Sequence, residues 1–141
     1  MQLLFVRAFL YKDDQCLLAR RCNTGFGDGL YSMIGGAVQN TETALQAIVR
    51  KVQLEIGATM SPDLFSFVHM LHLKSSDDGK PRILLCFAAA ISGIVFCNTD
   101  PDRCDDVRFF DCNQLPENML PAHKQIIECI QKDIYYSELG W

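Results

Sequence analysis

Several features that mark other protein classes are missing from this 141-residue sequence. No apolar run is long enough to span a bilayer, so no transmembrane helix is expected. The chain does not begin with a basic segment, an apolar run and a small-residue cleavage site, so we expect no signal peptide and a cytoplasmic protein. Its net charge of −4 gives no electrostatic reason to expect nucleic acid or an anionic membrane surface as a partner.

The seven cysteines lack the spacing of a metal site or of a disulfide framework. None of them forms a C-x-x-C pair, and their number is odd. We therefore expect neither a zinc site nor disulfides, which fits a reducing compartment. Cys16 and Cys86 fall within apolar runs, so we expect them to be buried thiols.

The sequence also has no linker, internal repeat or low-complexity segment, so we expect a single domain over residues 1–141. Apolar and β-forming runs alternate with turn residues, and two segments show helical spacing. Periodicity alone therefore indicates an α+β domain. The predicted strands are 3–11, 16–21, 30–34, 64–74, 82–92 and 107–110, with 93–97 either continuing the fifth strand or starting another.

The most informative stretch is residues 35–57. Its pattern predicts the end of a strand, a glycine turn and a helix that ends at a glycine. Thr41 or Asn40 can cap the helix, and Glu42 would put negative charge in its first turn. Gly57 is typical of a helix end. The core-facing stripe is predicted to be Leu45, Ile48, Val49, Val52 and Ile56. A last helix is predicted to begin at Pro121, with a buried stripe of Ile126, Ile127, Ile130 and Ile134.

This stretch resembles the signature of the Nudix (MutT-like) hydrolases, G-x5-E-x7-R-E-U-x-E-E-x-G-U, in which U is a bulky apolar residue. The residues that match at the family's spacing are Gly36, Glu42, Arg50, Val52, Glu55 and Gly57. The resemblance implies the Nudix fold, a mixed β-sheet sandwiched between helices (an αβα sandwich). It also implies hydrolysis of the diphosphate of nucleoside diphosphates linked to another moiety.

Two positions of the signature differ from the family pattern. Lys51 and Leu54 stand where the family has glutamates, which bind a divalent metal ion in Nudix enzymes. The resemblance therefore implies Mg²⁺ or Mn²⁺ as cofactor, but we expect weak binding because magnesium prefers oxygen ligands and a lysine opposes a cation. Lys51 and Leu54 are either solvated surface in a site that has diverged or part of a repurposed site.

The resemblance assigns roles to the matching residues of the helix. Glu55 would be the chief metal ligand and catalytic carboxylate, with Glu42 in support. Arg50 either holds these acids in place or forms a structural ion pair with a neighbouring loop. Since many family members take a further acid from a late loop, Asp105 or Asp106 is a candidate second metal ligand; the alternative is that both are solvated turn carboxylates.

The candidate substrate-binding residues are Arg20, Lys51, Gly35 and Gly36. Gly35 and Gly36 allow a close turn. Arg20 and its neighbour Arg21 end a predicted strand, where they can face either a diphosphate or solvent.

Two functions remain open from the sequence. The first is a Nudix pyrophosphohydrolase whose metal-dependent activity is weak or lost, acting on a nucleoside diphosphate-type small molecule. The alternative is a non-catalytic nucleotide- or protein-binding module on the same scaffold. In that module Lys51 would pair with a phosphate, and Leu54 would line an apolar pocket.

Overall fold

The computed structural model describes residues 3–141 of the chain. Within this range the strands are β1 (Leu3–Lys12), β2 (Gln15–Arg21), β3 (Tyr31–Ser32), β4 (Ile34–Ala37), β5 (Ser66–Lys74), β6 (Pro81–Ala90), β7 (Cys104–Asp111) and β8 (Tyr136–Leu139). The helices are α1 (Ala44–Ile56) and α2 (Pro121–Gln131), with a short 3-10 helix at Pro62–Leu64. No helix in the described range has the length and apolar character needed to cross a bilayer.

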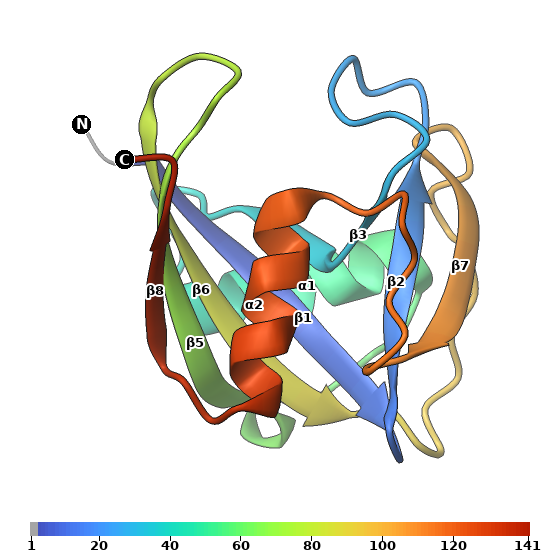
Figure 1. The fold of residues 1–141 in the computed structure, drawn as a ribbon. Helices are drawn as coiled ribbons and strands as arrows, with labels where there is room; N and C mark the ends of the chain where they lie inside the picture. The colour runs from blue at the N-terminus through green and yellow to red at the C-terminus, as the bar shows by residue number, and fades with distance from the viewer. Residues whose placement is uncertain (1–2) are drawn as a thin grey trace.

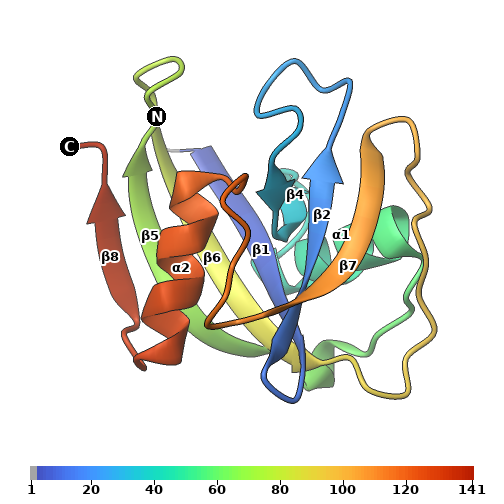
Figure 2. The same ribbon diagram turned by 45° about the vertical axis from the view of Figure 1, so that its right-hand side comes forward.

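The strands form one mixed sheet whose main path is β3-β2-β1-β6-β5-β8, with β4 added to β1 and β7 to β2. The pairs β1–β6 and β5–β8 are parallel, and the other pairs are antiparallel. Helix α2 crosses one face of the sheet, and α1 lies behind the opposite face (Figure 1 and Figure 2). The predicted α+β fold, with a mixed sheet between helices, is therefore confirmed.

The sheet divides because β1 changes partners along its length. Tyr11 and Lys12 pair with β2, whereas residues 5–8 pair with β4. Strands β2, β3 and β7 consequently diverge from β1, β6, β5 and β8 toward the top of Figure 1. This division of the sheet is what creates room for a site.

Alternation along β1 sends its side chains into two apolar layers. Val6 and Leu10 pack beneath α1 together with Ile48 of that helix. Phe9 packs in the opposite layer with Ile126 of α2. Since burying a side chain of this size contributes roughly 1.5–3 kcal/mol, the two layers hold both helices on the sheet.

The start of α1 differs from the prediction. Thr43 caps the helix instead of Thr41 or Asn40, because its Oγ1 accepts the Gln46 N–H at 3.1 Å while the Gln46 side chain accepts the Thr43 N–H at 2.8 Å. This reciprocal pair satisfies two N–H groups that the helix leaves unbonded. Glu42 therefore precedes the helix and does not lie in its first turn.

The strand predicted over residues 30–34 is divided into β3 and β4. Met33, between them, donates its N–H to Nδ1 of His123 on α2 at 2.9 Å. Because this N–H bonds to a side chain, the strand pairing is interrupted there. The junction of β3 and β4 is thereby tied to the first turn of α2.

Three further predictions near strand and helix ends are wrong. Strand β6 ends at Ala90, earlier than predicted, and residues 93–97 form no strand. They cross instead to the end of α1, where the Cys97 N–H donates to the Ile56 carbonyl at 2.9 Å. Ile134 lies beyond the end of α2 and is 41% exposed, so it does not belong to the buried stripe.

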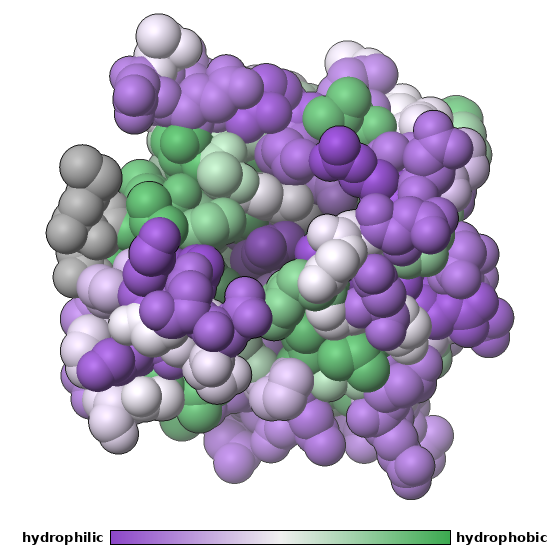
Figure 3. Space-filling view, turned by 90° about the horizontal axis from the view of Figure 1, so that it is seen from above, coloured by the Kyte–Doolittle hydropathy of each residue, from purple (hydrophilic) through white to green (hydrophobic). Residues whose placement is uncertain are grey.

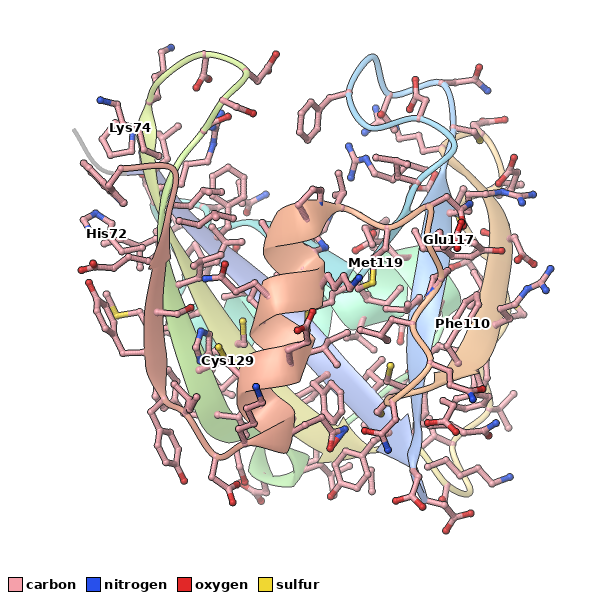
Figure 4. All side chains as sticks on the ribbon, viewed as in Figure 1. His72, Lys74, Phe110, Glu117, Met119 and Cys129 are labelled. Carbon is pink, nitrogen blue, oxygen red and sulfur yellow. The ribbon has the colours of Figure 1, made fainter. Side chains whose placement is uncertain are left out.

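The segment before α2 is held against β3. The Tyr31 N–H donates to the Asn118 carbonyl at 2.7 Å, and the Leu120 N–H donates to the Tyr31 carbonyl at 3.0 Å. Met119, between these bonds, is buried beside the N-terminal end of α2 (Figure 4). The Tyr31 ring also packs edge-on against Phe110 of β7, with centroids 4.8 Å apart. These contacts fix the start of α2 next to the division of the sheet.

All seven cysteines are free thiols. Cys16 and Cys86 are buried, as predicted. Burial raises the pKa of Cys86 to about 12, so this thiol stays protonated and packs as a small apolar side chain.

Candidate functional site

A cavity of about 440 Å³ opens where the two halves of the sheet diverge. One wall comes from β1, β4 and α1, and the facing wall comes from β2, the β2–β3 loop and the segment that leads into β7. Figure 3 views the molecule from above and shows hydrophilic side chains over most of this face, with smaller apolar patches. Of the predicted substrate-binding and catalytic residues, the cavity brings together Arg20, Gly35, Gly36, Lys51 and Glu55.

Lys51 reaches across the glycine turn into this cavity. A Cβ atom added at Gly36 would lie 2.6 Å from Lys51 Cε, so the lysine stem occupies the space that a side chain would fill. Its Nζ lies 3.9 Å from Glu55 Oε2, and only 21% of the Lys51 side chain is exposed. Lys51 is therefore directed into the site.

Glu55 is held against the same turn. Its Oε2 accepts the Gly35 N–H at 3.1 Å, and the side chain is largely shielded from water. Burial raises the pKa of the Glu55 carboxyl, while the nearby Lys51 and Arg7 charges and the Gly35 hydrogen bond act in the opposite direction. Desolvation is the largest of these effects, so the carboxylate is less stable here than in water.

The cavity carries an excess of positive charge although the whole chain has a net charge of −4. Five cationic side chains line it, against two carboxylates. The cations are Arg7, Arg20, Arg21, Lys51 and Arg103, and the carboxylates are Glu55 and Asp100. Because low-dielectric walls strengthen the field of such a cluster, the cavity favours an anionic ligand.

The sequence identified both arginines at the end of β2 and left their direction open. Arg20 Nε donates to Asp105 Oδ1 at 2.7 Å, and its guanidinium lies over the Tyr31 ring. Arg21 Nε donates to the Phe26 carbonyl at 2.8 Å. These hydrogen bonds fix the positions of both side chains. Both arginines also line the cavity, so a ligand can contact them.

Arg7 is a lining residue that the sequence reasoning missed. It is the only charged residue in the apolar run 3–11, and that isolation is the signal that could have identified it. Its Nη1 donates to the Met33 carbonyl at 3.2 Å, whereas its Nε is buried and has no hydrogen-bond partner among residues 3–141.

The predicted catalytic pair Glu42 and Arg50 lies outside the cavity lining. Arg50 donates to both carboxylate oxygens of Glu42, at 3.0 and 2.7 Å, and to the Ala37 carbonyl at 3.2 Å. The Arg50 hydrogen bonds lower the pKa of Glu42, with help from the Gln39 N–H. Of the two roles left open for Arg50, the geometry supports the structural ion pair, which fixes the loop after β4 to α1.

The two candidate acids that were expected in a loop, Asp105 and Asp106, lie in β7 and contact other side chains. Asp105 forms the ion pair with Arg20. Asp106 accepts hydrogen bonds from the Tyr31 hydroxyl and from Arg108. The Tyr31 bond, followed by the Arg108 bond, lowers the pKa of Asp106. Within the structure described, neither carboxylate lines the cavity beside Glu55.

The donor set does not fit the magnesium site that the resemblance implies. Magnesium requires several oxygen ligands in near-octahedral geometry. No group of three or more His, Cys, Asp and Glu side chains among residues 3–141 is arranged to hold a metal ion. At the glycine turn Glu55 instead faces the Lys51 ammonium.

Leu54 does not line the cavity in the described structure, and its side chain is 55% exposed. Its carbonyl accepts the Thr99 hydroxyl at 2.9 Å. The proposed apolar-pocket role of Leu54 therefore has no support in the geometry. Of the two replaced glutamate positions, only Lys51 contributes to the site.

Replacing Glu55 by glutamine tests the effect of its burial. Because the folded-state pKa is raised, the native state binds the proton more tightly than the unfolded state. The stability that depends on this proton is lost as pH rises from the unfolded pKa through the raised folded pKa. We therefore expect the unfolding free energy of Glu55→Gln, relative to wild type, to increase in urea titrations as the pH rises above about 4.3, the ordinary pKa of a glutamate.

The matched control is Glu117→Gln, which removes one exposed carboxylate away from the cavity. A relative stability of Glu55→Gln that stays constant or falls over this pH range would show that burial does not disfavour the carboxylate.

The comparisons with known proteins agree with the fold. A family model described as the NUDIX domain matches residues 1–129. An ADP-ribose pyrophosphatase of Methanocaldococcus jannaschii is 32% identical over 126 residues, which cover 87% of this chain and 69% of that protein.

Solved structures show the same fold. A MutT Nudix hydrolase from Burkholderia pseudomallei superposes with a TM-score of 0.81 at 18% identity, covering 91% of this chain and 97% of that one. The Nudix domain of Shewanella oneidensis NrtR, solved with ADP ribose, gives a TM-score of 0.73 at 26% identity, covering 94% and 88%. The family match and the archaeal relative show that this chain belongs to the Nudix hydrolase family.

Proposed function

We propose that this chain binds a nucleoside diphosphate derivative in the cavity and neutralises the diphosphate with Lys51 instead of a divalent ion. Metal-dependent hydrolysis is then weak or lost. The proposal goes beyond family membership, since Nudix hydrolases generally use a divalent metal. The archaeal relative is named for ADP-ribose, and the NrtR domain was solved with it. Both names support a ligand of this class.

The observation that carries the proposal is the position of the Lys51 ammonium, 3.9 Å from Glu55 beside the glycine turn. Two like unit charges about 4 Å apart repel by about 4 kcal/mol at an effective dielectric of 20, and a divalent ion at this place would be repelled more strongly. The same ammonium attracts a phosphate. Lys51 therefore disfavours binding of the metal ion and supplies part of the positive charge that the metal ion would bring.

The remaining cavity residues suit an extended anion. Arg20 and Arg21 stand on the wall that faces Lys51, and Arg103 lies where the chain enters β7. A diphosphate between these walls would be contacted from both sides. Gly36 presents no side chain between Lys51 and the cavity, so the ammonium is accessible.

A second candidate function, residual hydrolysis, is supported by Glu55. It occupies the family's glutamate position, and burial raises its pKa. A carboxylate with a raised pKa is a better proton acceptor for an attacking water. Hydrolysis would still require positive charge to offset the charge of the phosphates. Lys51 supplies only one positive charge.

Lys51→Ala tests the proposal directly. A charge-assisted contact with phosphate contributes on the order of 1.5–3 kcal/mol. We therefore expect isothermal titration with ADP-ribose, in the presence of a chelator, to show affinity reduced by roughly tenfold or more. The control is Lys12→Ala, which removes an exposed lysine at the β1–β2 turn. If Lys51→Ala and wild type bound ADP-ribose with equal affinity, Lys51 would be a solvated surface residue and the proposal would be contradicted.

The reverse change tests why the metal is disfavoured. Lys51→Glu would place a second carboxylate beside Glu55, and two adjacent acids repel each other until a cation binds. We expect magnesium to raise the melting temperature of Lys51→Glu clearly more than that of wild type. Adding Leu54→Glu should increase this response only slightly, because Leu54 is exposed outside the cavity. A magnesium response in wild type as large as in Lys51→Glu would contradict the proposal.

A further inference from the structure

Arg7 is a cation of the cavity whose charge has little compensation. Its Nη1 donates to the Met33 carbonyl, and its Nε is buried with no hydrogen-bond partner in the part of the chain that the structure describes. Arg7 forms no ion pair with any carboxylate of residues 3–141, whereas Arg20 has Asp105 and Lys51 has Glu55. A buried charge without a counter-charge is unfavourable. An anion bound in the cavity would relieve that cost.

The groups near Arg7 offset its charge only in part. Arg21 is close enough to disfavour the charge of Arg7. His123, on the other side of the Met33 peptide, accepts the Met33 N–H at Nδ1. Burial and the two arginines keep the pKa of His123 well below its usual range, so the ring stays neutral. Glu55 attracts Arg7 but already faces Lys51 and the Gly35 N–H.

Arg7 and Lys51 approach the cavity from opposite faces of the sheet. The side chains of Phe5 and Phe9, which alternate with Val6 and Ala8 along β1, pack in the layer of α2, and Arg7 shares their side of the strand. Lys51 belongs to α1 and passes over Gly36. The two cations therefore reach the cavity from different elements, Arg7 from β1 and Lys51 from α1.

We infer that Arg7 forms a second anion subsite in this cavity, which takes a phosphate or phosphate monoester separately from the diphosphate at Lys51. The planar guanidinium suits the oxygens of such a group, since it can donate two parallel N–H bonds. Arg21 adds positive charge beside it. The inference rests on the proposed function only in that Lys51 is the diphosphate subsite.

Orthophosphate is the probe that separates this subsite from the Lys51 subsite. Titrated into the full chain without metal, it should bind saturably and raise the melting temperature. Arg7→Met should weaken binding by roughly tenfold or more, whereas Lys51→Met should retain it within about twofold. Arg108→Met is the matched control, because Arg108 is an exposed arginine paired with Asp106 outside the cavity lining. Unchanged orthophosphate binding by Arg7→Met overturns the inference.

A competition experiment tests whether the two subsites are separate. Wild type saturated with inorganic pyrophosphate, a probe of the Lys51 subsite, should still bind orthophosphate. Full competition between the two ligands overturns the separate subsite but leaves the Lys51 proposal intact. Ribose 5-phosphate then identifies the source: Arg7-dependent binding supports a phosphate monoester of a larger ligand, and binding of orthophosphate alone supports free phosphate at the same subsite.

A measurement on wild type keeps the inference testable if Arg7→Met does not fold. The Nε–H resonance of Arg7 should shift in NMR spectra as orthophosphate saturates the site, because bonding at the guanidinium changes its polarisation. The Arg50 Nε–H, already bonded to Glu42 outside the cavity, should not move. Saturation without any shift of the Arg7 resonance overturns the inference.

Discussion

The close contact between β4 and β1 is the constraint on which the site depends. A side chain at Gly35 would collide with the backbone of Val6, so only glycine lets β4 pair with residues 5–8 of β1 at this point. Because β4 occupies that edge of β1, β2 can pair with β1 only at its far end, and the sheet divides. The cavity lies in that division. Gly36 then leaves the space through which Lys51 passes.

One residue changes the chemistry that this scaffold can support. In the family pattern the helix gathers carboxylates, which only a cation can stabilise together. Here α1 presents Lys51 beside Glu55, and the two charges partly offset each other without a metal. The arginines of β2 and β1 extend the positive field, so a cavity in an acidic protein attracts anions. In the proposed function, phosphate recognition and metal binding are alternatives at this site.

Much of this could be predicted because the informative residues are close in sequence. The spacing from Gly36 to Gly57 identified the family, and the helical period correctly assigned Ile48, Val52 and Ile56 to the core. The cap of α1 was misassigned because several neighbouring side chains can cap a helix, and Thr43 is the one that forms a reciprocal pair with Gln46.

Other parts of the site depend on contacts between distant segments. Whether Arg7 faces water or a cavity is decided by where the sheet divides, which no local pattern of β1 records. Likewise, the helical period placed Lys51 and Leu54 on one face but did not locate the cavity edge, which includes Lys51 and leaves Leu54 outside. The sequence allows Asp105 as a metal ligand, but the pairing of β7 with β2 places it beside Arg20, with which it forms an ion pair.

The most direct test of the central claim is a crystal structure of the chain with ADP-ribose, determined both with a chelator and with excess magnesium. The account predicts the same complex in both, with Lys51 Nζ within hydrogen-bonding distance of a diphosphate oxygen and no metal ion at Glu55. A divalent ion bound between Glu55 and the diphosphate, with Lys51 turned away from the ligand, would contradict it.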